Sequence, residues 1–155
     1  EAEKKTMYEV PDFIKKSESE GFSHFINDAG GSLCELEDQA LFKLLSEKSL
    51  IVYIQTNSEN ERILIERAKT HPKPMYYDSK FFEKSIKTYL AENSLDYVAQ
   101  VSPDDFVSWV FPKLIEDRLK KYTAIAKKYG CTIQSDDLHN CRSANDVINL
   151  ISSAL

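Results

Sequence analysis

Glycine is scarce in this chain, with 4 residues among 155, and no internal repeat is visible. A chain of this composition is neither collagen-like nor of low complexity. Long apolar runs are missing too, because none approaches the roughly 18–20 residues that a membrane-spanning helix needs. The N-terminal residues EAEKKTMYEV are charged and lack the apolar stretch of a signal peptide. We therefore expect no association with a membrane.

Cysteine and histidine are also few, with three residues of each. The cysteines are Cys34, Cys131 and Cys141, and the histidines are His24, His71 and His139. Their spacing matches neither a zinc site nor a nucleophilic Ser-His-Asp or Cys-His arrangement. An odd number of cysteines without metal-like spacing indicates reduced thiols, so we expect a cytoplasmic protein.

Acidic residues outnumber basic ones, which gives a formal net charge of −5 and a pI of about 5.3. This balance argues against a general nucleic-acid-binding protein, although a local basic cluster is still compatible with phosphate binding. Hydrophobic residues make up 42% of the chain, which suits a single domain over residues 1–155 with a real core.

Helical patterns alternate with short apolar runs, which predicts an α/β layer fold. Residues 50–55 (LIVYIQ) form the strongest predicted strand, and their unbroken apolar character predicts burial on both faces, as in a parallel sheet. Residues 22–27 (FSHFIN) and 131–134 (CTIQ) predict two further strands.

The helices have recognisable ends. Pro11 suits the first turn of a short polar helix that Gly21 ends. A long helix is expected from about residue 102 to Tyr129, with Gly130 as its stop. Ser143 caps the last helix. Its apolar residues Val147, Ile148, Leu150 and Ile151 are expected to face the core.

Several segments resemble, in order, parts of the shikimate kinase-like branch of the P-loop kinases. HFINDAGG resembles a Walker B-like strand and its Gly-Gly turn, and LIVYIQTNSENERILIERAK resembles the next strand and the helix leading to the lid. KPMYY resembles the basic-Pro-apolar element of the lid. RLKKYTAIAKKYGCTIQSDD resembles the Arg-x-x-x-Tyr helix end and last strand, and NDVINLISSAL the closing helix.

This resemblance implies a three-layer α/β sandwich with a parallel sheet and a helical lid over residues 70–111. It also implies ATP and Mg²⁺ as ligands in the intact parent. The chain departs from the family in having Ala29 before the Gly-Gly pair, and its insert over residues 81–111 is longer than a simple lid. A shikimate substrate is therefore not expected, and the acceptor is left as a small molecule or an unknown substrate.

The phosphate-binding motif GxxxxGK[ST] is missing from this sequence. That loop supplies the backbone N–H donors, the Lys and the Mg²⁺-binding hydroxyl of such enzymes. The family places its first strand between the third and fourth, so residues 22–27 and 50–55 would lack a direct neighbour and leave two open edges. We expect an N-terminal P-loop segment or chain as a partner, and no ATP turnover by this chain alone.

Asp28 follows the first predicted strand, where the resemblance implies a catalytic, Mg²⁺-binding carboxylate. The alternative is an Asp that caps a turn before glycine. Gly30 and Gly31 would let a substrate approach the backbone closely, or would only form a tight turn.

The lid region carries the candidate cations. Arg67 is the catalytic candidate, Lys69 a nucleotide-binding one and Lys73 a substrate-binding one, because a kinase must neutralise charge on the transferring phosphoryl group. The alternative is a solvated basic helix end. The resemblance makes Arg118 a substrate-anion ligand. The alternative is a surface arginine paired with Glu116 or Asp117.

The start of the last helix supplies the remaining nucleotide-binding candidates, Arg142 and Ser143, for which plain N-capping by Ser143 is the alternative.

An aromatic stripe in the long helix is expected to be core rather than a partner surface. It comprises Phe106, Trp109, Val110 and Phe111.

Three functions are compatible with these patterns. The first is the C-terminal part of a P-loop kinase or ATPase. The second is a non-catalytic α/β binding module in which residues 70–111 form a partner surface. The third is a degenerate relative that binds an anion or nucleotide without turnover.

Overall fold

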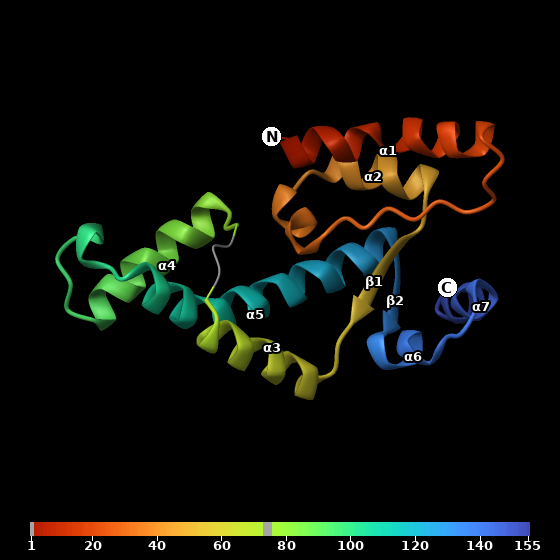
Figure 1. The fold of residues 1–155 in the computed structure, drawn as a ribbon. Coiled ribbons are helices and arrows are strands. Elements are labelled where there is room, and N and C mark those ends of the chain that lie inside the picture. Colours follow the sequence, from red (N-terminus) through yellow and green to blue (C-terminus); the bar gives the residue numbers. More distant parts are fainter. Residues whose placement is uncertain (1, 73–75) are drawn as a thin grey trace. The chain divides into compact units, whose positions relative to one another are not determined.

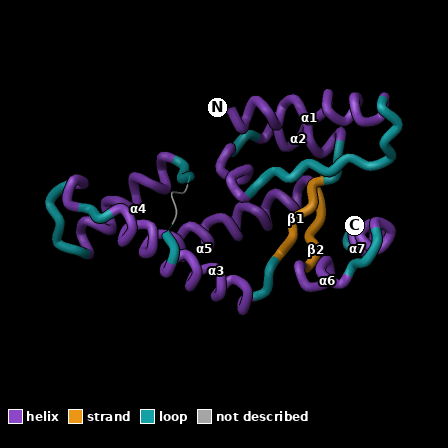
Figure 2. The backbone as a smooth tube through the Cα atoms, in the orientation of Figure 1, coloured by secondary structure: helices purple, strands orange, loops and turns teal. Residues whose placement is uncertain are grey.

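The computed structural model describes residues 2–72 and 76–155, which are mostly helical and contain a two-stranded parallel sheet (Figures 1 and 2). This architecture is compatible with the predicted α/β class. The elements are α1 (Ala2–Ser19), the 3-10 helix η1 (Gly31–Leu36), α2 (Gln39–Lys48), β1 (Ile51–Gln55), α3 (Ser58–Thr70), α4 (Ser79–Glu92), the 3-10 helix η2 (Val98–Gln100), α5 (Pro103–Tyr129), β2 (Gly130–Gln134), α6 (Ser135–Asn140) and α7 (Ala144–Ser153). Among the described helices, none has the length and apolar character that crossing a bilayer demands.

The chain divides into two units. The first consists of residues 1–55 and 120–155, and the second of residues 56–119. The division falls within α5, between Leu119 and Lys120. The predicted lid-like insert, residues 70–111, falls within the second unit.

Strands β1 and β2 pair in parallel, with Ile51 opposite Gly130 and Gln55 opposite Gln134. The prediction that residues 50–55 lack a direct neighbour is therefore wrong. Gly130 is required where α5 ends and β2 begins, because a Cβ there would collide with the carbonyl oxygen of Ile51. The predicted burial of β1 on both faces is also wrong. Ile54 is 50% exposed, and the other four residues of the strand are only partly buried.

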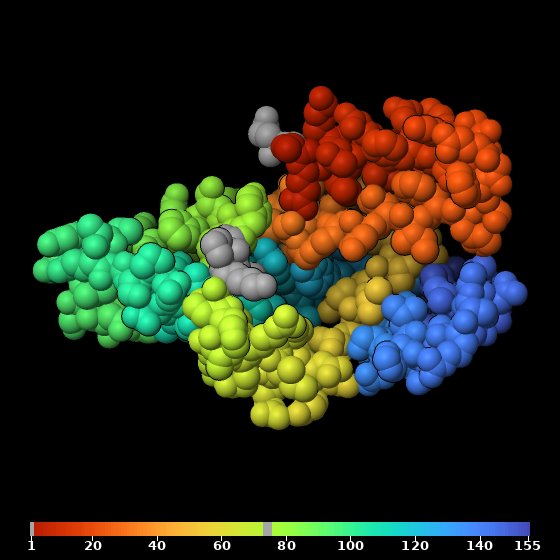
Figure 3. Space-filling model, in the orientation of Figure 1, coloured from red at the N-terminus to blue at the C-terminus, as the bar shows by residue number. Residues whose placement is uncertain are grey.

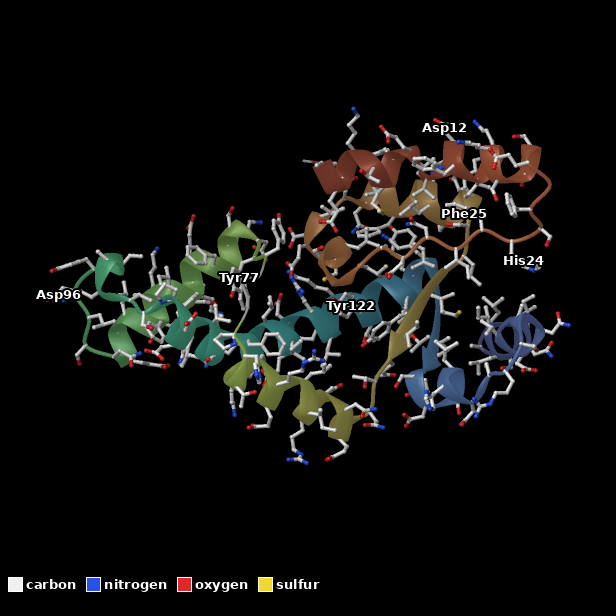
Figure 4. All side chains as sticks on the ribbon, in the orientation of Figure 1. Asp12, His24, Phe25, Tyr77, Asp96 and Tyr122 are labelled. Carbon is white, nitrogen blue, oxygen red and sulfur yellow. The ribbon has the colours of Figure 1, made fainter. Side chains whose placement is uncertain are left out.

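The predicted strand at residues 22–27 is not formed. The segment runs as a long loop between α1 and η1 (Figure 2), and its residues, His24 and Phe25 among them, are exposed (Figures 3 and 4). Ile26 is 88% exposed. A strand needs a hydrogen-bonded neighbour, and in the described residues the segment has none, although its sequence favours the extended state.

Helix α1 begins at Ala2, well before the predicted start, and Pro11 lies inside it. Proline costs a helix one backbone hydrogen bond. Burial offsets that loss, because Met7 and Val10 pack with Leu41 and Leu45 of α2 into the core of the first unit.

Asp38 links α1 to the start of α2. Its Oδ1 accepts a hydrogen bond from the Leu41 backbone N–H at 3.0 Å, as an N-cap. Its Oδ2 lies 2.6 Å from Lys4 Nζ and accepts from the Tyr8 hydroxyl at 3.1 Å. The Lys4 contact, followed by these hydrogen bonds, lowers the pKa of Asp38 to about 2.

Helix α7 begins as predicted, with Ser143 and Asp146 forming a reciprocal capping box. Its apolar face is less covered than expected. The described structure buries none of its residues completely, and Ile148 is 39% exposed. Too little of the first unit lies against this helix to cover its whole face.

The second unit has its own core, made by α4 and the first half of α5. Ile86 and Tyr89 pack against Phe106 and Val110. Trp109 lies 5.2 Å from Tyr89 between ring centroids, in an edge-on arrangement. The prediction that the aromatic stripe is core is confirmed for Phe106 and Val110.

Helices α1 and α4 end in the same way. The N–H of Phe22 bonds the Ser17 carbonyl at the end of α1, and that of Leu95 bonds the Leu90 carbonyl after α4. Both are Schellman motifs with a left-handed residue at C′. Gly21 occupies this position after α1, as predicted, with φ 86°, whereas Ser94 occupies it after α4 with φ 54°.

We predict that Ser94→Gly stabilises the protein by about 1 kcal/mol, because glycine adopts the left-handed conformation without steric cost. Gly21→Ala should destabilise it by a similar amount, since a Cβ there meets nothing within 4 Å and backbone strain is left as the dominant effect. Urea midpoints measure both, with Ser94→Ala as the control that retains the Cβ. A gain for Ser94→Ala equal to that for Ser94→Gly would contradict this explanation.

The pKa of Asp38 is lowered in the folded state. Its contribution to the stability of the fold is therefore fully present only above about pH 3.8, the ordinary pKa of an aspartate. That contribution should be lost as the pH falls from about 4 through 2. We expect Asp38→Asn to lower stability at pH 6 but to reduce the loss between pH 4 and pH 2. Urea unfolding at each pH tests this, with exposed Asp12→Asn as the control. Equal acid sensitivity of wild type and Asp38→Asn would refute it.

Candidate functional site

The Asp28–Gly31 turn lies between the exposed segment 22–27 and η1. Asp28 is exposed, and its Oδ1 accepts a hydrogen bond from the Gly30 N–H at 3.3 Å. Gly30 has φ 55° and ψ 166°, a backbone conformation available chiefly to glycine. Asp28 thus makes the turn contact given as its alternative role. A carboxylate has about four acceptor sites, so this single bond leaves room for a cation.

Tyr122 of α5, which is labelled in Figure 4, contacts the Gly-Gly turn directly. Its hydroxyl donates a hydrogen bond to the Gly31 carbonyl. Its ring packs on that of Tyr53 in β1, with centroids 5.2 Å apart. Cys34, which is buried, also donates to the Gly31 carbonyl, at 3.4 Å. The turn is therefore attached to both α5 and η1.

Glu35 is a buried charge that the sequence analysis missed. Its side chain is 0% exposed, and its Oε2 lies 2.8 Å from Nζ of Lys121, which is 22% exposed. Burial of an ionised carboxylate is expensive, and the Lys121 ammonium offsets part of that cost. No local pattern marks Glu35 as buried, because its partner lies 86 residues away.

A pocket of about 360 Å³ opens beside η1, α2 and α5 in the first unit. Gln39 lines it, and its Oε1 accepts hydrogen bonds from Lys128 Nζ and the Tyr129 hydroxyl, each at 2.7 Å. The predicted site residues are not among those that line this pocket. The lining residues are Cys34, Glu37, Gln39, Phe42, Lys121, Ala124 and Ile125.

Arg118, in the second unit, is buried, with 8% of its surface exposed. The alternative of a surface arginine is therefore wrong. Its Nη2 donates a hydrogen bond to the Tyr76 carbonyl at 3.0 Å, which fixes the residues before α4. Burial raises the pKa of the neighbouring Tyr77, and the positive charge of Arg118 opposes that rise.

The described lid candidates, Arg67 and Lys69, are solvent-exposed. Arg67 lies near the end of α3. Lys69 Nζ lies 2.8 Å from Oε1 of Glu66, which precedes it by one helical turn. This arrangement fits the solvated helix end that was the alternative reading. Lys73 lies outside the described residues.

At the start of α7 the Ser143 hydroxyl accepts a hydrogen bond from the Asp146 N–H at 3.2 Å. Asp146 Oδ2 accepts from the backbone N–H groups of Arg142 and Ser143, each at 2.9 Å, and these bonds lower the pKa of Asp146. The N-cap role of Ser143 is confirmed. Arg142 contributes its backbone here, and its side chain is exposed.

Among the predicted residues, the structure brings Asp28, Gly30 and Gly31 together in one turn. Arg142 and Ser143 belong to the same unit, whereas Arg67, Lys69 and Arg118 belong to the second. The turn and its α5 contacts are therefore the best-defined candidate site within one unit.

Comparison with protein-family models, with curated proteins and with solved structures gives no match for this chain.

We predict an asymmetric effect at the Glu35–Lys121 pair. Lys121→Met should destabilise the first unit by about 3 kcal/mol, because it leaves the buried Glu35 charge without its 2.8 Å partner. Glu35→Gln should cost about 1 kcal/mol, since the partly exposed Lys121 can turn toward water. Denaturant unfolding of both variants measures the difference. Equal costs would show that the burial of Glu35 does not determine the stability of this region.

Proposed function

We propose that this chain is the C-terminal part of a P-loop kinase-like ATPase, in which the Asp28–Gly31 turn forms the metal side of the nucleotide site. The observation that carries this proposal is the incomplete sheet of the first unit. Strand β1 pairs with β2 in parallel, while the extended segment 22–27, which leads into the Gly-Gly turn, has no strand beside it in the described chain.

In this proposal the element missing from the sheet is one parallel strand with the helix that follows it. The family order inserts one parallel strand between segment 22–27 and β1. The same core receives Ala29, just after the segment, and Ile51, at the start of β1. An inserted strand would supply hydrogen bonds to both edges, and the helix after it would add a layer over the sheet. The complete domain would then be the three-layer sandwich of the P-loop kinases.

The exposed apolar surface of the first unit supports this placement. Phe25 and Ile26 of the segment, Ile54 of β1 and Ile148 of α7 are all exposed by 39% or more. Isolated exposed apolar residues are common, but an open strand edge together with an uncovered helix face indicates missing structure.

In the complete enzyme each candidate would have one task. Asp28 would hold Mg²⁺ directly or through water, and the P-loop would bind the phosphates of ATP. Arg67, Lys69 and Lys73 would supply positive charge from the lid, and Arg142 and Ser143 would border the nucleotide. Arg118 would contact an anionic acceptor, because a guanidinium pairs well with carboxylate and phosphate oxygens.

We predict that the longest polypeptide encoded by the gene hydrolyses ATP in the presence of Mg²⁺. Asp28→Ala in that polypeptide should leave folding intact and lower turnover by about 100-fold or more, because the metal loses its carboxylate. Asp12→Ala, which removes an exposed carboxylate paired only locally with Lys15 in the described residues, is the matched control. ATP turnover per enzyme and circular dichroism give the two readouts. Full activity of Asp28→Ala would exclude its metal role.

The same open edge favours a second candidate, a non-catalytic module that binds a partner through strand addition. The two candidates differ in their response to nucleotide. An ATPase polypeptide gains thermal stability from Mg²⁺-ATP, by an amount that grows with the logarithm of the ligand concentration above Kd, whereas an interaction module gains none. Thermal unfolding of the longest polypeptide with and without Mg²⁺-ATP separates them.

A further inference from the structure

Helix α5 holds both ends of η1 through two adjacent side chains. Lys121 pairs with Glu35 near the C-terminal end of η1, and Tyr122 donates its hydroxyl to Gly31 at the N-terminal end. The Lys121 contact fixes the body of η1. The Tyr122 contact is different, because it acts on the backbone of the Gly-Gly turn itself.

The turn needs an external contact to keep one conformation. Two consecutive glycines have more accessible backbone states than any other pair, so ordering them costs more entropy. The internal bond from Gly30 to Asp28 is long, at 3.3 Å, and Cys34 is a weak thiol donor. The phenol of Tyr122 is the stronger donor, and its ring is held in place against Tyr53.

We propose that Tyr122 is a positioning residue, whose hydroxyl fixes the Asp28–Gly31 turn and thereby the direction of the Asp28 carboxylate. This inference rests on the proposed function, because the consequence for catalysis requires Asp28 to hold the metal. Tyr122 touches neither metal nor nucleotide in this scheme. It acts through the Gly31 carbonyl, two peptide units beyond the Gly30 N–H that Asp28 binds.

The test uses Tyr122→Phe, which removes the hydroxyl and retains the ring that packs on Tyr53. The matched control is Tyr129→Phe on the same helix, whose hydroxyl binds Gln39 at 2.7 Å and not the turn. The first readout is amide hydrogen exchange of residues 30–36 in this chain. We expect exchange about tenfold faster in Tyr122→Phe and unchanged in Tyr129→Phe, the size expected for one lost hydrogen bond.

The second readout is Mg²⁺-ATP hydrolysis by the longest polypeptide that the gene encodes. A displaced carboxylate affects the reaction step more than nucleotide binding, so we expect kcat to fall about ten- to hundredfold in Tyr122→Phe, with KM for ATP changed less than about twofold. Tyr129→Phe should retain wild-type kcat. A smaller folded fraction would also lower the apparent kcat without changing KM, so kcat is calculated per folded enzyme, with the folded fraction of both variants measured by circular dichroism.

Each outcome has a distinct meaning. Faster exchange together with lower kcat supports the positioning role. Unchanged exchange in Tyr122→Phe overturns it, as does wild-type kcat despite faster exchange. If the wild-type polypeptide hydrolyses no ATP, the proposed function fails and the catalytic role of Tyr122 fails with it. If the wild-type polypeptide hydrolyses ATP and Tyr122→Phe has the same kcat, the positioning role is contradicted and the proposed function is not.

Discussion

The parallel pairing of β1 with β2 is the constraint on which the first unit depends. It joins strands 75 or more residues apart in sequence, so the chain must close a long loop before it gains these hydrogen bonds. Gly130 makes the pairing possible, since a side chain would collide with the Ile51 carbonyl. The pairing brings the end of α5 beside β1, where Tyr122 packs on Tyr53 and reaches the Gly31 carbonyl.

Polar contacts from α5 determine the local geometry on both sides of the division between the units. Arg118 holds the Tyr76 carbonyl within the second unit, and Lys121 holds Glu35 within the first. These interactions are buried or half-buried, so each side chain has lost water and depends on its partner. Here α5 also fixes two irregular backbone segments, one in each unit.

The first unit has an uneven distribution of buried surface. Met7, Val10, Leu41 and Leu45 form a closed core between α1 and α2. In contrast, β1 and α7 present apolar residues to solvent. A parallel sheet is ordinarily covered on both faces and continued by further strands. The proposed P-loop kinase arrangement would place segment 22–27 in a larger sheet with a defined strand order and a defined site.

The sequence by itself determined the local elements whose signals are contained within a few residues. Gly21 marked the end of α1, Ser143 and Asp146 marked the start of α7, and residues 51–55 and 131–134 were found as strands. Such features depend on backbone conformation and neighbouring side chains, which sequence patterns record directly. The predicted α/β class, with which the mostly helical structure is compatible, and the position of the Gly-Gly turn followed from the same kind of evidence.

Strand pairing, the extent of α1 and the burial of charged side chains depend on residues far away in the sequence, so only the tertiary structure decided them. Residues 22–27 have a strand-like sequence but no ladder, because a strand exists only beside another strand. Pro11 lies inside α1 because the burial of Met7 and Val10 outweighs its local cost. Glu35 and Arg118 are buried because Lys121 and the Tyr76 carbonyl lie beside them. These outcomes result from long-range contacts, whose free energies no local pattern contains.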